Sequence, residues 1–253
     1  MIQRMVTSAL FAGVAAGLLA ALLHFAFVQK YILLGEDYET GAAMHFAGVA
    51  GPSDPAVGSP HSHDTAANDH DHDAESVDGH VHDHGAATPP LKRNALTIVF
   101  FALLYSAYGL VLVAGFALAQ HFGQRVTPRE GLLWGLAGFA CLHLAPALGL
   151  APELPGTAAA DLTDRQLWWA ATAICTAAGL AMIGYGRQPL WVILAVGVLA
   201  LPHLIGAPEL EGFSGVAPPE VASAFAARTL AVGLAAWGVM GWLAGWYWNR
   251  AQA

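Results

Sequence analysis

Charged residues are scarce in this chain of 253 residues: Asp, Glu, Lys and Arg make up 11% of it, whereas hydrophobic residues make up 56%. Soluble domains carry about 25% charged residues, so the polar surface of an ordinary water-soluble fold is missing. Basic residues are the scarcer kind, with 10 Lys and Arg against 18 Asp and Glu, and no basic stripe suited to nucleic acid is present. The same balance excludes disordered, collagen-like and disulfide-rich chains. The class that remains is a polytopic helical membrane protein.

Cysteine is almost absent as well. Cys141 and Cys175 both lie inside apolar runs and form no C-x-x-C motif. A lone buried thiol usually behaves as a small hydrophobic residue. We therefore expect these two side chains to pack in the protein without a chemical role.

Six apolar segments are candidates for crossing the hydrocarbon core of a bilayer, which takes roughly 20 apolar residues. They are residues 5–28, 95–119, 131–151, 167–185, 189–206 and 225–248. The first resembles a signal peptide, but its apolar run is too long and no clear A-x-A site closes it, so we expect a retained span. Gly and Ala are frequent in all six, which predicts closely packed helix backbones. The expected fold is an all-α membrane protein with six transmembrane helices.

The third and fifth segments lead into matching sequences. Residues 151–156 read Ala-Pro-Glu-Leu-Pro-Gly and residues 207–212 read Ala-Pro-Glu-Leu-Glu-Gly, and a His-Leu pair precedes each stretch. The match predicts two parallel helical-hairpin repeats, residues 131–186 and 189–248. The first two segments resemble a weaker third copy of the same hairpin. The domain division expected from this is 1–50 for the first helix and its exit segment, 51–90 for a connecting loop, and 91–253 for the other five helices.

Alternating spans place the C-terminal ends of the first, third and fifth helices at one membrane face. Ionisable residues inside spans are costly and mark functional sites. The candidates for contact with a metal or substrate near that face are His24, His143, His203, Glu153 and Glu209.

Two prolines strengthen this expectation, and two arginines offer an alternative to it. Pro146 and Pro202 cannot donate a backbone hydrogen bond, and each frees the carbonyl four residues earlier. Such carbonyls are expected to line a cavity together with the imidazoles. In the alternative interpretation the histidines are structural groups at helix ends, and the two glutamates pair with Arg165 and Arg228.

The loop between the first two helices carries a second candidate site. Residues 51–90 contain eight acidic residues and no Lys or Arg, and they account for the whole charge imbalance of the chain. Imidazole and carboxylate together suit divalent first-row metals, although such a flexible tract selects poorly among them. Without apolar residues the loop is expected to be disordered until metal binds; the alternative is a solvated acidic linker. The candidate ligands are His61, His63, His70, His72, His80, His82 and His84.

The basic residues do not settle the orientation by number, because they divide evenly between the two sides. Arg4 directly precedes the first span, which often dominates topology, and long acidic loops translocate regardless of their charge. We expect both termini in the cytoplasm and residues 51–90 on the outer side.

Four features together resemble the CbtA family of proposed cobalt transporter subunits. They are the opening Met-Ile-Gln-Arg with its Gly/Ala-rich span, the His-rich insertion, Ala-Pro-Glu-Leu-Pro-Gly at 151–156, and Asp-Arg-Gln-Leu-Trp-Trp at 164–169. The resemblance covers essentially the whole chain. It implies an inner-membrane bundle of five or six spans for cobalt uptake, associated with cobalamin biosynthesis. It also implies a partner, CbtB, a short single-span protein with a His-rich end.

The expected function is that of a membrane subunit for uptake of a divalent transition metal. The expected cargo is Co²⁺, with Ni²⁺ or Zn²⁺ as alternatives, and no permanently bound cofactor is expected. A metal-storage or assembly factor would need the loop but not the histidines inside the membrane. A membrane metalloenzyme would use three histidines around an open metal position, but no H-E-x-x-H motif or nucleophile context is found. A Walker A sequence is missing too, so ATP coupling would require another chain.

Overall fold

The computed structural model describes residues 2–43, 89–210, 212 and 215–250, and within these residues the fold consists of helices joined by turns and loops, with one isolated β-bridge between Thr157 and Gly215. The helices, with η marking π-helices, are α1 (Ile2–Leu23), η1 (His24–Val28), α2 (Gln29–Glu39), α3 (Pro90–His121), α4 (Pro128–Phe139), η2 (Ala140–Leu144), α5 (Ala145–Ala147), α6 (Leu162–Tyr185), α7 (Pro189–Ile205) and α8 (Pro219–Arg250). This confirms the all-α class. The loop expected to lack regular structure, residues 51–90, falls almost wholly outside the described residues.

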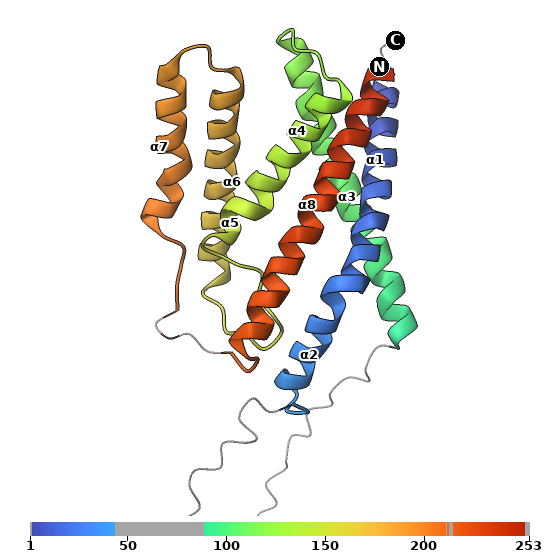
Figure 1. The fold of residues 1–253 in the computed structure, drawn as a ribbon, viewed down its shortest axis with the longest axis vertical. Coiled ribbons are helices and arrows are strands. Elements are labelled where there is room, and N and C mark those ends of the chain that lie inside the picture. Colours follow the sequence, from blue (N-terminus) through green and yellow to red (C-terminus); the bar gives the residue numbers. More distant parts are fainter. Residues whose placement is uncertain (1, 44–88, 211, 213–214, 251–253) are drawn as a thin grey trace, which may run out of the picture.

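The helices form rods that alternate in direction along the chain (Figure 1). α1, η1 and α2 join into one continuous rod, and α4, η2 and α5 join into another. The rods that begin with α1, α4 and α7 run one way, and α3, α6 and α8 run the other way. The start of α1 and the end of α8 therefore lie at the same end of the bundle, which fits an even number of membrane passes.

Among the described residues, four helices are long and apolar enough to cross a membrane: Met5–Glu39, Pro90–His121, Leu162–Tyr185 and Pro219–Arg250. They correspond to the first, second, fourth and sixth apolar segments of the sequence. The third segment is helical but interrupted by η2, and the fifth forms α7 with only 17 residues. The structure thus confirms four long apolar helices, and six crossings remain a prediction.

Proline and glycine mark several helix ends. The first position of α3, α4 and α7 is occupied by Pro90, Pro128 and Pro189. At this position the N–H of any residue lacks an acceptor within the helix, so a proline there removes no helical hydrogen bond. At the other end of α7, Gly206 takes a φ of 91°, a backbone conformation that glycine adopts without steric cost. Local sequence therefore fixes where these rods begin and where α7 stops.

Two pairs of helices cross with their backbones in contact. A Cβ atom on Gly13 of α1 would lie 2.5 Å from the Ser106 Cα atom of α3. On α4 and α8, Gly131 and Gly241 approach so closely that a Cβ on either would collide with the carbonyl oxygen of the other. Small residues at four-residue spacing permit this approach between membrane helices. The close packing predicted from the Gly and Ala content is confirmed.

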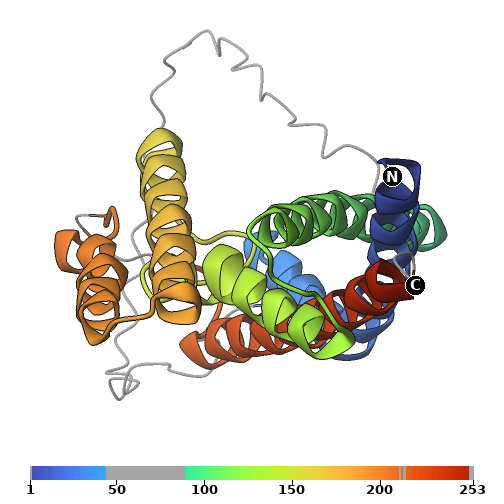
Figure 2. The same ribbon diagram turned by 90° about the horizontal axis from the view of Figure 1, so that it is seen from above.

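The α6–α7 hairpin stands to one side of the other helices (Figure 2). α1, α3, α4 and α8 pack together, whereas α7 contacts α6 alone among the described helices. α6 in turn joins the rest of the bundle mainly through η2 and α5. The η2–α5 region is therefore the joint between the hairpin and the four-helix core.

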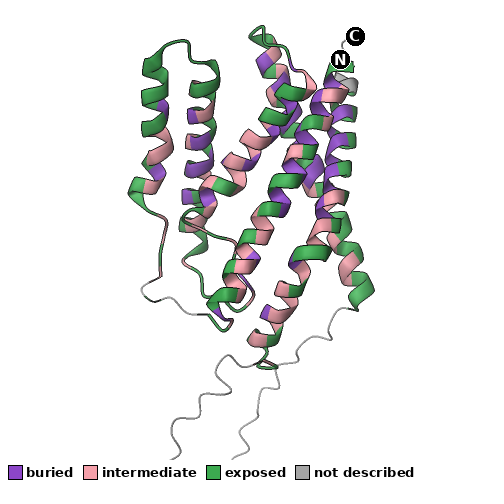
Figure 3. Cartoon of the chain, in the orientation of Figure 1, coloured by how far each residue is buried: buried purple, intermediate pink, exposed green. Residues whose placement is uncertain are grey.

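Exposed residues cover the outside of the rods (Figure 3), and many of them are large and apolar. Phe11, Leu22 and Val111 are each more than 60% exposed, and α7 exposes most of its residues. In water a surface of this extent would drive association, whereas in a bilayer the lipid chains cover it. The distribution of exposed side chains thus fits the membrane-protein class.

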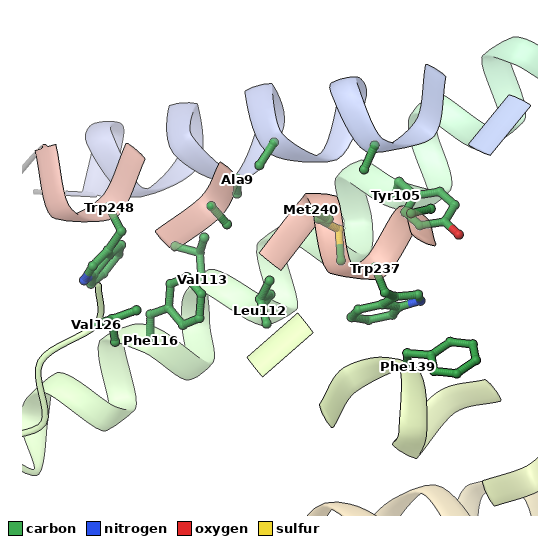
Figure 4. Packing of buried hydrophobic residues seen from close by; sticks show 14 of the residues in the cluster. Ala9, Tyr105, Leu112, Val113, Phe116, Val126, Phe139, Trp237, Met240 and Trp248 are labelled. Carbon is green, nitrogen blue, oxygen red and sulfur yellow. The ribbon is translucent and has the colours of Figure 1, made fainter. Parts of the chain in front are cut away.

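The core lies between α1, α3, α4 and α8 (Figure 4). Trp237, Met240 and Phe116 are fully buried there, and the alanines of α1 let that helix pack against them. Figure 4 shows Trp237 of α8 beside Phe139 at the end of α4. This aromatic region directly adjoins η2, where one of the candidate histidines lies.

Candidate functional site

Two candidate histidines lie in π-helical turns. His24 is the first residue of η1, and His143 is the fourth residue of η2. The N–H of Gln29 donates to the His24 carbonyl, and the N–H of Ala145 donates to the Ala140 carbonyl, five residues back in each case. Single π-helical turns within α-helices occur frequently at functional sites. Neither π-helical turn could be predicted from the periodicity of apolar residues. A π-helical turn adds only one residue to the helical repeat, which is too small a change to see in the pattern.

His143 is surrounded by aromatic rings from three elements. Its ring centroid lies 5.9 Å from Phe139 in a stacked arrangement, 5.9 Å from Tyr108 of α3, and 6.0 Å from Trp237 of α8. The Nε2 atom of His143 and the Nε1 atom of Trp237 are both buried and have no hydrogen-bond partner among the described residues. A buried polar group in that state costs about 1–3 kcal/mol, and a water molecule, an ion or another ligand would satisfy it.

A row of aromatic side chains on α3 links His24 to the surroundings of His143. The His24 ring lies 5.3 Å from Phe101, Phe101 lies 6.3 Å from Tyr105, and Tyr105 lies 5.8 Å from Tyr108. Tyr108 then contacts His143. This row was not predicted from the sequence, although the spacing of four and three residues between Phe101, Tyr105 and Tyr108 places all three rings on one helix face.

His203 lies apart from the other two histidines, near the end of α7. It borders a cavity of about 380 Å³, together with Ala145, Leu148, Thr176, Val196, Leu199 and Ala200. Its ring centroid is 5.8 Å from that of Trp168 on α6. The α6–α7 hairpin thus has a histidine-lined cavity on the side that faces α5.

The glutamates of the matching sequences differ in their surroundings. Glu153 forms an ion pair with Arg165 at 2.8 Å, the pairing that the alternative interpretation expected. Glu209 is exposed. Arg228 does not repeat the pairing of Arg165: its guanidinium carbon lies 4.6 Å from the ring centroid of Tyr31.

A second ion pair supports the similarity between the first and second hairpins. Arg93 and Glu36 lie 3.1 Å apart. Arg93 is the fourth residue of α3, and Arg165 is the fourth residue of α6. In both hairpins a histidine in a π-helical turn is therefore followed by a glutamate that pairs with the next helix at the same position. The division of the chain into hairpin repeats, residues 131–186 and 189–248, stays a prediction.

The carbonyl freed by Pro146 accepts a side-chain hydrogen bond. Trp169 of α6 donates its indole N–H to the Leu142 carbonyl oxygen at 3.2 Å. The carbonyl of Pro202 accepts the indole N–H of Trp168 at 3.1 Å. In the sequence the two tryptophans belong to the family motif at residues 164–169, and the hydrogen bonds of their indole N–H groups were not predicted.

Residues 151–156 fold back against the end of the bundle. Leu154 is 4% exposed and packs with Val28, Phe225 and Val232. Gly35 of α2 lies against this stretch, since a Cβ there would be 3.2 Å from the Pro155 ring. The stretch therefore lies against α2 and the first part of α8, at the end of the bundle where α2 stops (Figure 1).

The five candidates do not gather at one mouth in this conformation. Within the described ranges, no three His, Cys, Asp or Glu side chains are grouped closely enough to hold a metal ion. The physical reason is the displacement of the α6–α7 hairpin, which carries His203 away from the core, and the pairing of Glu153 with Arg165. Contact between a metal ion and any one of the five stays a prediction. The same holds for the loop histidines, which lie outside the described residues: His61, His63, His70, His72, His80, His82 and His84.

Comparison with protein families identifies a family that the chain matches. The family described as "Probable cobalt transporter subunit (CbtA)" matches residues 2–249, nearly the whole chain. Comparisons with curated proteins and with solved structures gave no match.

Proposed function

We propose that this chain, which belongs to the CbtA family of probable cobalt transporter subunits, conducts Co²⁺ through the membrane past histidines in its π-helical turns. The observation that carries the proposal is the buried Nε2 atom of His143, which lacks a partner among the described residues. A desolvated divalent ion needs ligands in place of its lost water. Neutral imidazole nitrogen is a ligand that suits Co²⁺, and also Ni²⁺ and Zn²⁺.

The two π-helical histidines would serve as successive contacts. His24 lies in η1, between the membrane-spanning part of α1 and the end of α2 from which residues 51–90 follow. His143 lies deeper in the aromatic core. An ion that moves from one to the other would pass the aromatic face of α3, whose rings offer cation–π attraction. His203 would provide a further contact at the α6–α7 cavity.

The seven histidines of residues 51–90 would capture the metal before it enters. Their imidazole and carboxylate groups bind divalent ions with little discrimination, so selectivity would depend on the membrane contacts. The Glu153–Arg165 pair and Leu154 lie at the end of the bundle where α2 stops. Glu153 and Glu209 would meet the ion there if Glu153 exchanges its arginine partner for metal.

The remaining assignments follow from family membership and from the direction of the helices. A subunit requires a partner, and we propose a CbtB-like protein with one span and a His-rich end. The chain would cross the inner membrane six times, with α4–α5 and α7 as the two shorter crossings. Both termini would lie in the cytoplasm, and residues 51–90 outside. The cobalt would supply cobalamin biosynthesis, and the chain would not act as an enzyme.

The test is cobalt uptake by cells that express the chain with and without the partner. His143→Ala should abolish most uptake at every cobalt concentration. His121→Ala is the matched control, because His121 is an exposed histidine at the end of α3 and its loss should leave uptake unchanged. Parallel assays with Ni²⁺ and Zn²⁺ identify the cargo. Normal uptake by a well-expressed His143→Ala/His203→Ala variant would contradict the proposal, and metal retention without uptake would favour a storage factor.

A further inference from the structure

Two adjacent tryptophans on α6 donate hydrogen bonds to two different helical rods. The Trp169 indole N–H bonds to the carbonyl oxygen of Leu142 in η2, at 3.2 Å. The Trp168 indole N–H bonds to the carbonyl oxygen of Pro202 in α7, at 3.1 Å. Each accepting carbonyl belongs to the residue directly before a candidate histidine. In each rod, the peptide unit that directly precedes the candidate histidine therefore accepts a hydrogen bond from a tryptophan of α6.

The two carbonyls differ in what their own helices supply. In a regular helix the Leu142 carbonyl would accept from residue 146, but Pro146 has no N–H to donate. The Pro202 carbonyl accepts the N–H of Gly206 at 3.1 Å in the last turn of α7, and it shares its second lone pair with Trp168. The Trp169 indole therefore supplies a donor that the Leu142 carbonyl lacks within its own rod, whereas the Trp168 indole adds a second bond to a carbonyl that already has its helical donor.

Trp168 also contacts the histidine and the adjoining turn directly. Its ring lies 5.8 Å from the His203 ring with an interplanar angle of 72°, and the residue is 8% exposed. A Cβ atom on Gly149 would come within 2.7 Å of the Trp168 ring. The indole is therefore packed between the turn that follows α5 and the imidazole of His203.

We infer that Trp168 and Trp169 are positioning residues, which fix the turns bearing His203 and His143 relative to α6. Neighbouring residues project about 100° apart around an α-helix, so one pair of side chains reaches the rods on two sides of α6. The inference rests on the proposed function, because the position of the imidazoles matters for transport only if they contact the ion. α6 then acts as the rigid element that keeps His143 and His203 at fixed positions relative to one another.

Replacement of each tryptophan by phenylalanine removes the N–H and retains an aromatic ring. With Trp168→Phe or Trp169→Phe, the cobalt concentration for half-maximal uptake should rise about threefold to tenfold, the range expected when one hydrogen bond is lost. The maximal rate per molecule should be retained. Trp242→Phe is the control, since Trp242 is an exposed side chain near the end of α8, and it should change neither value. In a His203→Ala background, Trp168→Phe should add no further effect.

A second measurement reports the position of η2 without transport. Cys141 lies in η2 and is 8% exposed, so its rate of reaction with a small thiol reagent follows the opening of this turn. In a Cys175→Ala background, Trp169→Phe should raise the labelling rate several-fold, whereas Trp242→Phe should not. Addition of Pro146→Ala supplies a backbone donor for the Leu142 carbonyl but no link to α6. The faster labelling should therefore persist in the Trp169→Phe/Pro146→Ala variant.

The outcomes separate the two proposals. Unchanged Cys141 labelling in Trp169→Phe overturns the positioning role, whatever the uptake assay shows. A return to slow labelling on addition of Pro146→Ala also overturns it, because the indole would then act only by satisfying a carbonyl. Normal uptake in the His143→Ala and His203→Ala variants overturns the proposed function, while faster labelling in Trp169→Phe would still support the link between α6 and η2.

Discussion

Glu36 and Arg93 form an ion pair at 3.1 Å although 57 residues separate them in the sequence. Beside them, the side-chain amide of Gln29 donates to the Asn94 side-chain oxygen at 2.8 Å. These contacts join the end of the first rod to the start of α3. The intervening segment therefore connects two points that the folded core already holds together.

Because those points are held independently, removal of the His-rich tract should leave the fold intact. A chain in which residues 61–84 are replaced by a Gly/Ser segment of equal length should unfold in detergent at the same temperature as the parent. Its cobalt uptake should fall when the metal is scarce and recover when the metal is abundant, because the tract only raises the local concentration. Loss of uptake at all concentrations in a stable, well-expressed variant would contradict this role.

Acidification should weaken metal capture by the full chain. An imidazole must be neutral to bind a metal, and its ordinary pKa of about 6.5 means that protons compete increasingly below that pH. Calorimetric titration with Co²⁺ should show fewer bound ions at about pH 5.5 than at about pH 7.5. The chain that lacks residues 61–84 is the control and should lose most of this pH-dependent binding. Equal binding by both chains would place the capture site elsewhere.

The crossing of α4 and α8 should not tolerate a methyl group. Gly241→Ala directs a Cβ into the backbone of Gly131 and Gly135, and overpacking of this kind typically costs about 1–3 kcal/mol. Gly197→Ala on α7 is the matched control, because no atom lies within 4 Å of the added Cβ and alanine favours helix over glycine. Denaturant unfolding in detergent should show a loss for the first variant and none for the second. Equal stability of the two variants would refute the close crossing.

The ion pair between Glu153 and Arg165 should contribute little to stability. Its side chains are 33% and 27% exposed, and pairs accessible to solvent typically contribute about 0–1 kcal/mol. Arg165→Gln should therefore change the unfolding temperature only slightly. Glu153→Gln should be equally mild for stability yet reduce cobalt uptake, if the carboxylate contacts the ion. Equal uptake by the two variants would mean that Glu153 serves only as the partner of Arg165.

For the candidate residues, the sequence named side chains but did not predict their arrangement. His143 was singled out because an ionisable residue lies inside an apolar segment, and its Nε2 atom has no hydrogen-bond partner among the described residues. Glu153 was assigned both a metal role and a pairing with Arg165, and the pairing is found. Arg228 was expected to pair in the same way, but it lies over Tyr31 of α2 instead, because which group meets Arg228 depends on how the first rod packs against α8.

The sequence alone determined the properties that one segment of the chain carries by itself. Scarce charge and long apolar runs specified helices for a membrane, and prolines specified where α3, α4 and α7 begin. Glycines at four-residue spacing permitted the close crossings.

Only the tertiary structure decided which polar groups meet. The bonds from Trp168 to Pro202 and from Trp169 to Leu142 span 34 and 27 residues, and the cavity at His203 exists only because α7 packs on α6. Hydropathy and periodicity describe each helix separately, whereas these contacts depend on how the rods are rotated and placed against one another. For that reason His143 lies in the aromatic core and His203 lies outside it, although both follow from the same sequence pattern.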